Sequence, residues 1–215
     1  MSELHGIKVA IDIFDIKCRD LINNRYPYIY RSGSQELFSE WFEKGIPFDI
    51  QHFGANDHPD AVIEGVGFEL KSLKSNGSIQ FNSTIPCGRF RRKDQEGECY
   101  YAIARYKMDR DFGNLQEFCL CYGDYFNFDH TFAHSHQNTQ EIGFGDYGDG
   151  VVRHRKMYSF PSPIRTVPGI SLILNIDNAQ ELNPNLVLEN SIIRTERGTQ
   201  NQHVFYVYRH KLLYK

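Results

Sequence analysis

The segment "NDHPDAVIEGVGFELKSLKS", residues 56–75, carries the strongest signal for the fold of this chain. Within it, residues 60–72 predict two short strands joined around the triplet "GVG", residues 65–67. The runs on either side of these glycines are apolar and short, as is typical of buried strands. We therefore expect a small hairpin that places its polar residues at defined positions.

Three polar residues of the hairpin are expected to converge. Side chains alternate along a strand, so Glu69 and Lys71 share one face, while Leu70 points with Phe68 into the core. Asp60 opens the first strand, and the return of the hairpin brings it beside Glu69. The pattern thus predicts two carboxylates and one ammonium group at a common point.

Such a group of side chains matches the ligand preferences of a hard divalent cation. Mg²⁺ takes oxygen ligands, and usually only one or two carboxylates together with water and substrate phosphate. Asp60 and Glu69 would supply the carboxylates, and the Leu70 carbonyl is a candidate for a further oxygen. Lys71 would then orient the attacking water or stabilise negative charge.

The arrangement resembles the PD-(D/E)xK nuclease superfamily, and most closely its type II restriction endonucleases. The residues that carry the resemblance are Pro59, Asp60, Glu69 and Lys71. The resemblance implies metal ligation by Asp60 and Glu69, a catalytic role for Lys71, and products with 5′-phosphate ends. It also implies an α/β fold with a mixed central sheet flanked by helices.

The resemblance extends over about residues 34–86. Residues 34–44, "SQELFSEWFEK", have one apolar stripe and predict the helix that such nucleases place before the first acidic residue. Glu36 is the candidate for a helix glutamate facing the site, with Glu40 as the alternative. The segment "SIQFNSTIP", residues 78–86, resembles the polar segment that follows the catalytic strand in several restriction enzymes.

The rest of the chain is expected to complete one domain. Residues 6–24 predict a helix, although the alternation of Ile7, Val9, Ile11 and Ile13 would also suit a strand that runs into a helix. Residues 85–215 would hold the remaining sheet and a β-rich, loop-rich DNA-recognition region, including a long polar stretch at 127–169. The expected strands are 48–54, 61–65, 67–73, 99–108, 115–123, 170–177, 186–194 and 203–210.

Composition fits a globular protein with a substantial core. The 215 residues are 40% hydrophobic, 14% aromatic and 24% charged, and the formal net charge is −3. That charge gives no global basic character, although a local basic patch is enough for DNA binding. The five scattered cysteines and the absence of a secretory signal predict a reduced, cytoplasmic protein. No run of 18 uncharged apolar residues is present, so we expect no membrane span.

Two basic clusters are candidates for DNA contact. Their side chains would neutralise phosphates, and an arginine could also pair with guanine. Polar residues of the segment after the hairpin could contact base edges or the backbone, or cap a turn. The candidates are Arg89, Arg91, Arg92 and Lys93; Arg153, His154, Arg155, Lys156 and Arg165; and Gln80, Asn82, Ser83 and Thr84.

Other chemistries are less well supported. His130, His134 and His136 lie near Cys119 and Cys121, but this spacing does not match a zinc site, and Cys-x-Cys in an apolar strand suits two core residues. The paired histidine and asparagine context of HNH nucleases is not found. No phosphate-binding loop of the G-x-x-x-x-G-K-S/T type is present, so ATP-driven work is not expected.

The sequence therefore predicts a Mg²⁺-dependent, sequence-specific endonuclease of double-stranded DNA. A palindromic target would favour a homodimer, and a cognate methyltransferase would act on the same site. One alternative is a repair or junction-resolving nuclease of the same superfamily. Another is a non-catalytic DNA-binding or interaction domain. Asp57 and Glu64 are rival acids, Asp57 three residues before Asp60 and Glu64 within the hairpin.

Overall fold

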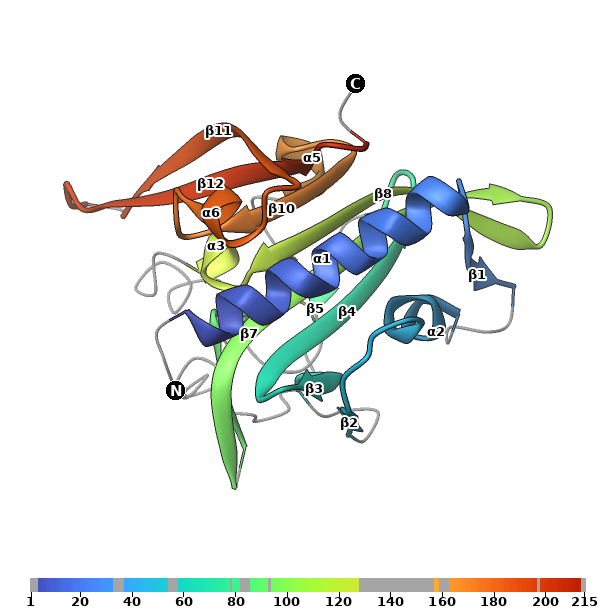
Figure 1. Cartoon of the computed structure of the whole chain (residues 1–215), viewed down its shortest axis with the longest axis horizontal. Coiled ribbons are helices and arrows are strands. Elements are labelled where there is room, and N and C mark those ends of the chain that lie inside the picture. Colours follow the sequence, from blue (N-terminus) through green and yellow to red (C-terminus); the bar gives the residue numbers. More distant parts are fainter. Residues whose placement is uncertain are drawn as a thin grey trace.

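The chain folds as an α/β protein around a large mixed sheet (Figure 1). The computed structural model describes residues 4–32, 37–53, 58–77, 79–81, 86–92, 94–127, 157–158, 163–196 and 198–213. The helices are α1 (His5–Asn23), α2 (Leu37–Glu43), α3 (Asp124–Asn127), α5 (Pro163–Thr166) and α6 (Ala179–Leu182). The strands are β1 (Tyr28–Arg31), β2 (Ile50–His52), β3 (Ala61–Ile63), β4 (Val66–Lys74), β5 (Gln80–Phe81), β6 (Arg89–Arg92), β7 (Gln95–Asp109), β8 (Phe112–Tyr122), β9 (Met157–Tyr158), β10 (Ile170–Leu174), β11 (Leu186–Thr195) and β12 (Gln202–His210).

The main sheet has the strand order β11-β12-β10-β8-β7-β4-β3-β2. Strand β4 runs parallel to β7, and β10 runs parallel to β8, whereas the other pairs along this path are antiparallel. Strands β1 and β6 join the sheet beside β8 and β7. Strands from both the expected catalytic segment and the C-terminal half thus belong to one sheet.

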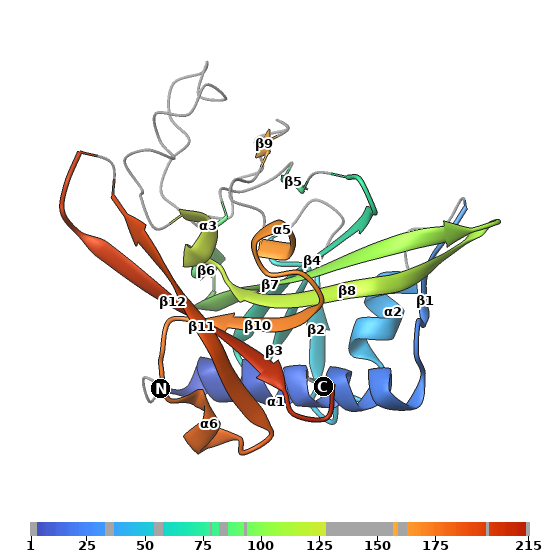
Figure 2. The ribbon, with the colours of Figure 1, turned by 90° about the horizontal axis from the view of Figure 1, so that it is seen from above.

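Helices cover both faces of this sheet (Figure 2). Helices α1, α2 and α6 pack on one face, where the buried cluster includes Phe14, Trp41 and Phe68. Helices α3 and α5 lie on the other face, over a cluster that includes Tyr101 and Phe126. Since Phe68 and Leu70 face α1, the alternating Glu69 and Lys71 must face the side of α3 and α5.

The expected helix at residues 6–24 is confirmed by α1, which resolves the ambiguity between helix and strand. Its buried residues follow helical rather than strand spacing because the whole stripe packs on the sheet. The helix begins against the side chain of Glu98, and a Cβ at Gly6 would overlap that carboxylate. Glu98 therefore lies at the positive end of the helix dipole, a favourable place for an acidic group.

Helix α2 is tied to α1 by a buried lysine. The Lys17 ammonium group is fully buried, and it donates hydrogen bonds to the carbonyls of Trp41 at 2.7 Å and Lys44 at 2.6 Å. The Trp41 carbonyl lies in the last turn of α2 and the Lys44 carbonyl directly after it, where the helix itself offers no partner. Burial lowers the pKa of Lys17 to about 8. Lys17 thus fixes the C-terminal end of the helix that precedes the hairpin.

Each expected strand is confirmed, with shifted ends. Strand β7 begins at Gln95 because its first residues pair with β6, and β7 and β8 pair with each other as far as the Asp109–Phe112 turn, so both are longer than the expected strands 99–108 and 115–123. Four strands were not predicted from the sequence, namely β1, β5, β6 and β9. Strand β6 was treated only as a basic cluster, since three of its four residues are arginines. No helix in the described part of the chain combines the length and apolar character needed to cross a membrane.

Candidate functional site

The hairpin at residues 60–74 is tighter than expected. Ile63 pairs directly with Val66, so Glu64 and Gly65 form the turn, and Val66 and Gly67 already belong to strand β4. Both turn residues have positive φ, 52° for Glu64 and 79° for Gly65, as a two-residue turn with the twist of its strands requires. The expected turn at residues 65–67 was wrong, because the triplet gave no sign that Glu64 would adopt a left-handed conformation.

The turn sets a register that brings Asp60 next to Glu69. Ala61 pairs with Phe68, so the next position along each strand places Asp60 opposite Glu69 on the same face. Asp60 lies directly before β3 rather than inside it, and its Oδ2 accepts a 2.7 Å hydrogen bond from the backbone N–H of Leu70. Asp60 is thereby fixed to the middle of β4.

Lys71 completes the expected group of three. Its Nζ lies 2.5 Å from Glu69 Oε1 and 4.0 Å from Asp60 Oδ2. Glu69 is almost fully enclosed, with a side chain only 3% exposed, whereas the side chains of Lys71 and Asp60 are 27% and 39% exposed. The site is therefore anchored on a buried carboxylate and opens to solvent through the other two groups.

A fourth residue, His58, belongs to this site and was not predicted. Its ring is buried, and Nδ1 lies 2.9 Å from Glu69 Oε2. Its other nitrogen, Nε2, lies 3.8 Å from the Cys99 sulfur, and the ring stacks on Tyr101 with centroids 6.1 Å apart. The only sequence signal for His58 as a site residue was its place in "HPD", directly before Pro59. Sequence alone does not show that this side chain turns inward.

Burial and neighbouring charges shift the pKa values of Asp60, Glu69 and Lys71. Burial and the neighbouring Glu69 charge raise the pKa of Asp60 to about 6, against the opposing effects of Lys71, the Leu70 N–H and His58. Burial alone would raise the pKa of Glu69, but Lys71 and His58 outweigh it and hold that pKa well below its usual range. Burial lowers the pKa of Lys71, yet the charges of Glu69 and Asp60 outweigh it and give a net rise. Near neutral pH, Glu69 is therefore a carboxylate and Lys71 an ammonium ion.

Gly67 allows the segment before Asp60 to lie against the sheet. A Cβ at Gly67 would lie 2.7 Å from Phe90 Cδ1 and 2.8 Å from Pro59 Cγ, closer than real Cβ contacts. Gly67 itself is buried within β4, between β3 and β7. The absence of a side chain here lets Pro59 and Phe90 close over the strand. Gly67 thus helps to hold His58 and Asp60 in place.

The oxygen donors of the site fit a hard divalent ion. Asp60 and Glu69 supply two carboxylates, and a carboxylate oxygen can accept more than one hydrogen bond or metal contact. The N–H and C=O of one strand residue point to the same side, so the Leu70 carbonyl points to the edge where Asp60 lies. Across the described residues, no group of three or more His, Cys, Asp or Glu side chains is arranged to bind a metal. Two carboxylates and a backbone carbonyl are donors of the kind that Mg²⁺ takes together with several waters.

The rival and supporting acids are placed differently. Glu64 is exposed at the turn, with its carbonyl 2.7 Å from His5 Nε2. Glu40 is exposed on α2, which buries Phe38, Trp41 and Phe42 on the α1 face of the sheet. Glu36 and Asp57 lie outside the described residues. Of the acids considered from sequence, the structure brings together Asp60 and Glu69.

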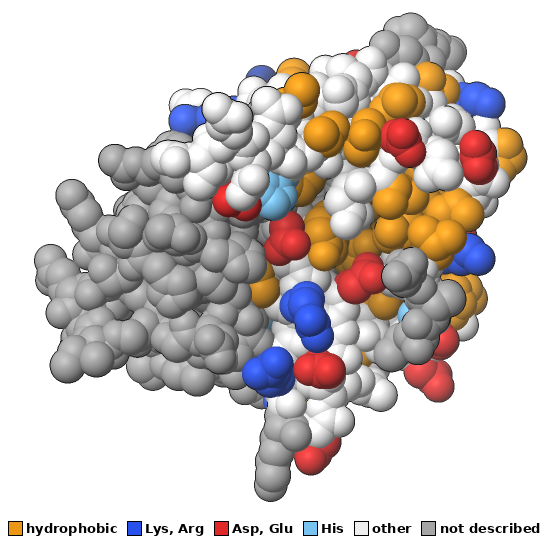
Figure 3. Space-filling model, turned by 90° about the vertical axis from the view of Figure 1, so that its left-hand side faces the viewer, with side chains coloured by type: hydrophobic (Ala, Val, Ile, Leu, Met, Phe, Trp, Pro, Cys, Tyr) orange, Lys and Arg blue, Asp and Glu red, His pale blue; other side chains and the backbone are white. Residues whose placement is uncertain are grey.

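The arginines of β6 lie close to an acidic residue. Arg89 and Arg91 are exposed, and their guanidinium nitrogens lie 3.8 Å and 3.6 Å from the Glu96 carboxylate across the hairpin. Arg92 packs its guanidinium 3.8 Å from the centre of the Phe53 ring. Among the described residues drawn in Figure 3, basic and acidic side chains lie close to one another. Since exposed ion pairs are weak, DNA phosphates could compete with Glu96 for both arginines.

Most other DNA-contact candidates lie outside the described residues. The side chain of Gln80 is among these, although its backbone pairs with Tyr158 in the small β5–β9 sheet. Arg165 is exposed on α5. The candidates that the described residues do not include are Asn82, Ser83, Thr84, Lys93, Arg153, His154, Arg155 and Lys156, together with His130, His134 and His136.

The cysteines considered for zinc are core residues. Cys119 and Cys121 are fully buried in β8 among apolar side chains, and all five cysteines are free thiols. Burial raises the pKa of the Cys121 thiol well above its usual range. The interpretation of these two cysteines as small core residues is confirmed.

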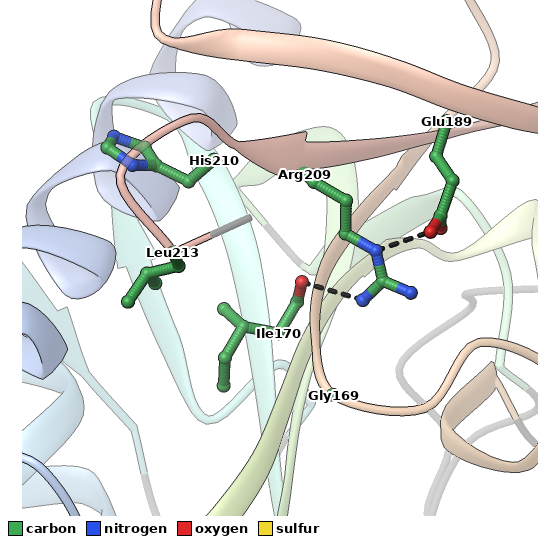
Figure 4. A pocket seen from close by; sticks show the side chains of 6 residues that line it. All are labelled: Gly169, Ile170, Glu189, Arg209, His210 and Leu213. Atoms are coloured by element: carbon green, nitrogen blue, oxygen red, sulfur yellow. Dashed lines mark hydrogen bonds and ion pairs between the residues drawn. The ribbon is translucent and has the colours of Figure 1, made fainter. Parts of the chain in front are cut away.

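A separate cavity of about 330 Å³ lies at β10 and β12 (Figure 4). It is lined by Gly169, Ile170, Glu189, Arg209, His210 and Leu213. Arg209 is already bound to Glu189 and to the Ile170 carbonyl, each at 2.8 Å, and His210 lies 2.9 Å from Asp15. Strands β7 and β8 separate this cavity from Glu69 in the strand order, so it does not belong to the site.

No family model matches the chain, and comparisons with curated proteins and with solved structures gave no significant match.

Proposed function

We propose that this protein is a Mg²⁺-dependent DNA endonuclease, of the type II restriction class that its hairpin resembles. The observation that carries the proposal is the convergence of Asp60, Glu69 and Lys71 at one partly open point of the sheet. Two carboxylates beside an ammonium group suit a phosphodiester substrate, whose hydrolysis builds negative charge. The restriction-endonuclease-like fold is part of this proposal.

Each group has a distinct role in the proposed reaction. Asp60 and Glu69 would hold the metal, with the Leu70 carbonyl as a further donor, and the bound metal would supply Lewis-acid stabilisation of charge on the scissile phosphate. Lys71 remains charged, because the neighbouring carboxylates raise its pKa. It therefore orients the attacking water and stabilises the developing negative charge, rather than removing a proton. The product carries a 5′-phosphate.

The substrate and partners follow from the same proposal. Arg89 and Arg91 are placed on an exposed strand where they can contact phosphates, as positioning contacts without sequence information. A palindromic duplex target would be cut by a homodimer, one strand by each subunit. A cytoplasmic methyltransferase acting on the same site would complete a restriction–modification pair.

The decisive experiment incubates the protein with plasmid DNA and Mg²⁺, beside an Asp60→Ala variant. Discrete fragments that the variant does not produce support the restriction endonuclease. Nicks at mismatches or branched structures without discrete fragments would instead support a repair or junction-resolving nuclease. DNA that stays intact with the wild-type protein, over a range of salts and divalent ions, would overturn the proposal.

A non-catalytic role is favoured by one specific observation. The 2.5 Å contact between Lys71 and Glu69 is also what a structural ion pair in a binding domain would show. Lys71→Arg preserves such an ion pair, but it changes the shape and position of the cation beside the phosphate. A binding domain would keep its DNA affinity and stability in Lys71→Arg, and its wild type would shift DNA in a gel without cleavage. A nuclease would lose most of its cleavage rate.

A further inference from the structure

The buried His58 ring connects the core to the proposed metal-binding carboxylate. Its Nδ1 is 2.9 Å from Glu69 Oε2, while Lys71 lies 2.5 Å from the other oxygen, Oε1. The two oxygens of Glu69 are thus each held by a different neighbour. This arrangement fixes the plane of the carboxylate as well as its position.

The chemistry of the partners defines which atom donates. An ionised carboxylate only accepts hydrogen bonds, so the bond to Glu69 Oε2 requires the proton on His58 Nδ1. The other ring nitrogen, Nε2, faces the Cys99 sulfur at 3.8 Å. Burial raises the pKa of the Cys99 thiol, so this group retains its S–H as a weak donor. The His58 ring therefore lies between the Cys99 thiol and Glu69, with Nδ1 facing the carboxylate.

We propose that His58 is a positioning residue for the reaction: its Nδ1–H holds the Glu69 carboxylate in the orientation that binds the divalent ion. This inference rests on the proposed nuclease function. A carboxylate that ligates a metal needs an oriented lone pair, and hydrogen bonds to the ligand supply that orientation. Without His58, Glu69 Oε2 loses its donor, and the carboxylate is free to turn further toward Lys71.

The test compares His58→Leu with His58→Asn. The asparagine amide nitrogen is attached at the position of Nδ1 and can donate to Glu69, whereas leucine fills a similar space without a donor. Cys119→Ala is the control, because it removes a fully buried side chain from the same core cluster without touching Glu69. The readouts are Mn²⁺ affinity by calorimetry without DNA, the single-turnover cleavage rate in Mg²⁺, and DNA affinity in Ca²⁺.

We expect His58→Leu to weaken Mn²⁺ binding by roughly 10- to 100-fold and to slow cleavage by a similar factor, with little change in DNA affinity. His58→Asn should recover most of the Mn²⁺ affinity, and Cys119→Ala should keep the wild-type value. Wild-type Mn²⁺ affinity in a folded His58→Leu variant would overturn the positioning role alone. Equal losses in the leucine and asparagine variants would overturn it as well, since a donor would then not matter. A wild-type protein that neither binds Mn²⁺ nor cleaves DNA would overturn the nuclease function itself.

Discussion

The backbone N–H of Leu70 donates a 2.7 Å hydrogen bond to the carboxylate of Asp60. This bond joins the residue before β3 to the middle of β4, beyond the last pair of the β3–β4 ladder. Asp60 is thus held beside Glu69 although two carboxylates repel one another. Such an arrangement costs stability in the free protein, and a bound cation would relieve it.

Replacing Asp60 by asparagine should stabilise the metal-free protein while abolishing metal binding. Asparagine can still accept the Leu70 hydrogen bond, but it removes the repulsion with Glu69 that raises the pKa of Asp60. Because the Asp60 side chain is 39% exposed, solvent screening limits the gain to less than about 1 kcal/mol. Thermal unfolding with and without Mn²⁺ measures both effects. Glu64 is an exposed acid of the same hairpin, and Glu64→Gln should change neither the stability nor the Mn²⁺ binding. A lower melting temperature for Asp60→Asn would contradict the inferred repulsion between Asp60 and Glu69.

Metal binding should weaken as the pH falls through about 6, because Asp60 becomes protonated there while Glu69 remains ionised. In the metal-free protein, the contribution of Asp60 to the free energy of unfolding changes with pH in the opposite direction. The folded state binds the Asp60 proton more tightly than the unfolded chain, where the usual pKa is 3.8, so this group's contribution to stability falls as the pH rises from about 4 to about 6. Mn²⁺ calorimetry and chemical unfolding from pH 4 to 8 check both trends. Asp60→Asn should remove the contribution of this group to both pH dependences. Metal affinity that is constant from pH 5 to 7 would disprove the predicted weakening of metal binding.

Replacing both Arg89 and Arg91 by glutamine should weaken DNA binding about equally for all sequences. If each arginine neutralises one phosphate, the slope of log affinity against log salt should fall in magnitude by about 2. Fluorescence anisotropy with a labelled duplex in Ca²⁺, at several salt concentrations, measures this slope. The matched control removes the same charge near the C-terminal end of α1, with Arg19→Gln in the helix and Arg25→Gln just after it. An equal change in slope for both double variants would show that only net charge matters.

Replacing Gly67 by alanine should disturb the site through its neighbours Phe90 and Pro59. Its Cβ would overlap Phe90 and Pro59, and overpacking of this kind typically costs about 1–3 kcal/mol. Since Pro59 precedes Asp60 directly, we also expect a lower cleavage rate and weaker Mn²⁺ binding. The additional change Phe90→Leu frees space beside the new methyl group and should recover part of the lost stability, as measured by urea unfolding. Simple additivity of the two changes would argue against this contact.

Removing the Lys17 ammonium group should loosen α2 from α1. Lys17→Met leaves the Trp41 and Lys44 carbonyls without this donor, and unsatisfied groups of this type cost about 1–3 kcal/mol. Lys8→Met, an exposed lysine on the same helix, is the control and should have little effect. Hydrogen exchange would show faster exchange in residues 37–46 of the Lys17 variant. Unchanged exchange there would mean that the packing of Trp41 and Phe42 and the 2.8 Å hydrogen bond from Trp41 Nε1 to Asp20 hold α2 without Lys17.

Local patterns predicted most secondary-structure elements because the apolar spacing is strong. The stripe of α2 and the short apolar runs of β3, β10 and β12 each bury side chains at the spacing expected. Strand β6 escaped detection because its arginines face outward and only Phe90 enters the core. The left-handed conformation of Glu64 was not predicted either. It follows from the pairing of Ile63 with Val66, which no local propensity encodes.

By itself, the sequence determined that Glu69 and Lys71 share a face and that Asp60 lies close to them, because a strand alternates its side chains and a hairpin reverses the chain over a short distance. Tertiary structure alone decided that His58 turns inward to Glu69, that Gly67 is covered by Pro59 and Phe90, and that Glu69 is buried. These contacts join segments distant along the chain, such as residues 58 and 99, through the packing of β4 against β7. Side-chain spacing is a local property of the backbone, whereas burial and the pKa shifts that follow from it depend on the whole sheet.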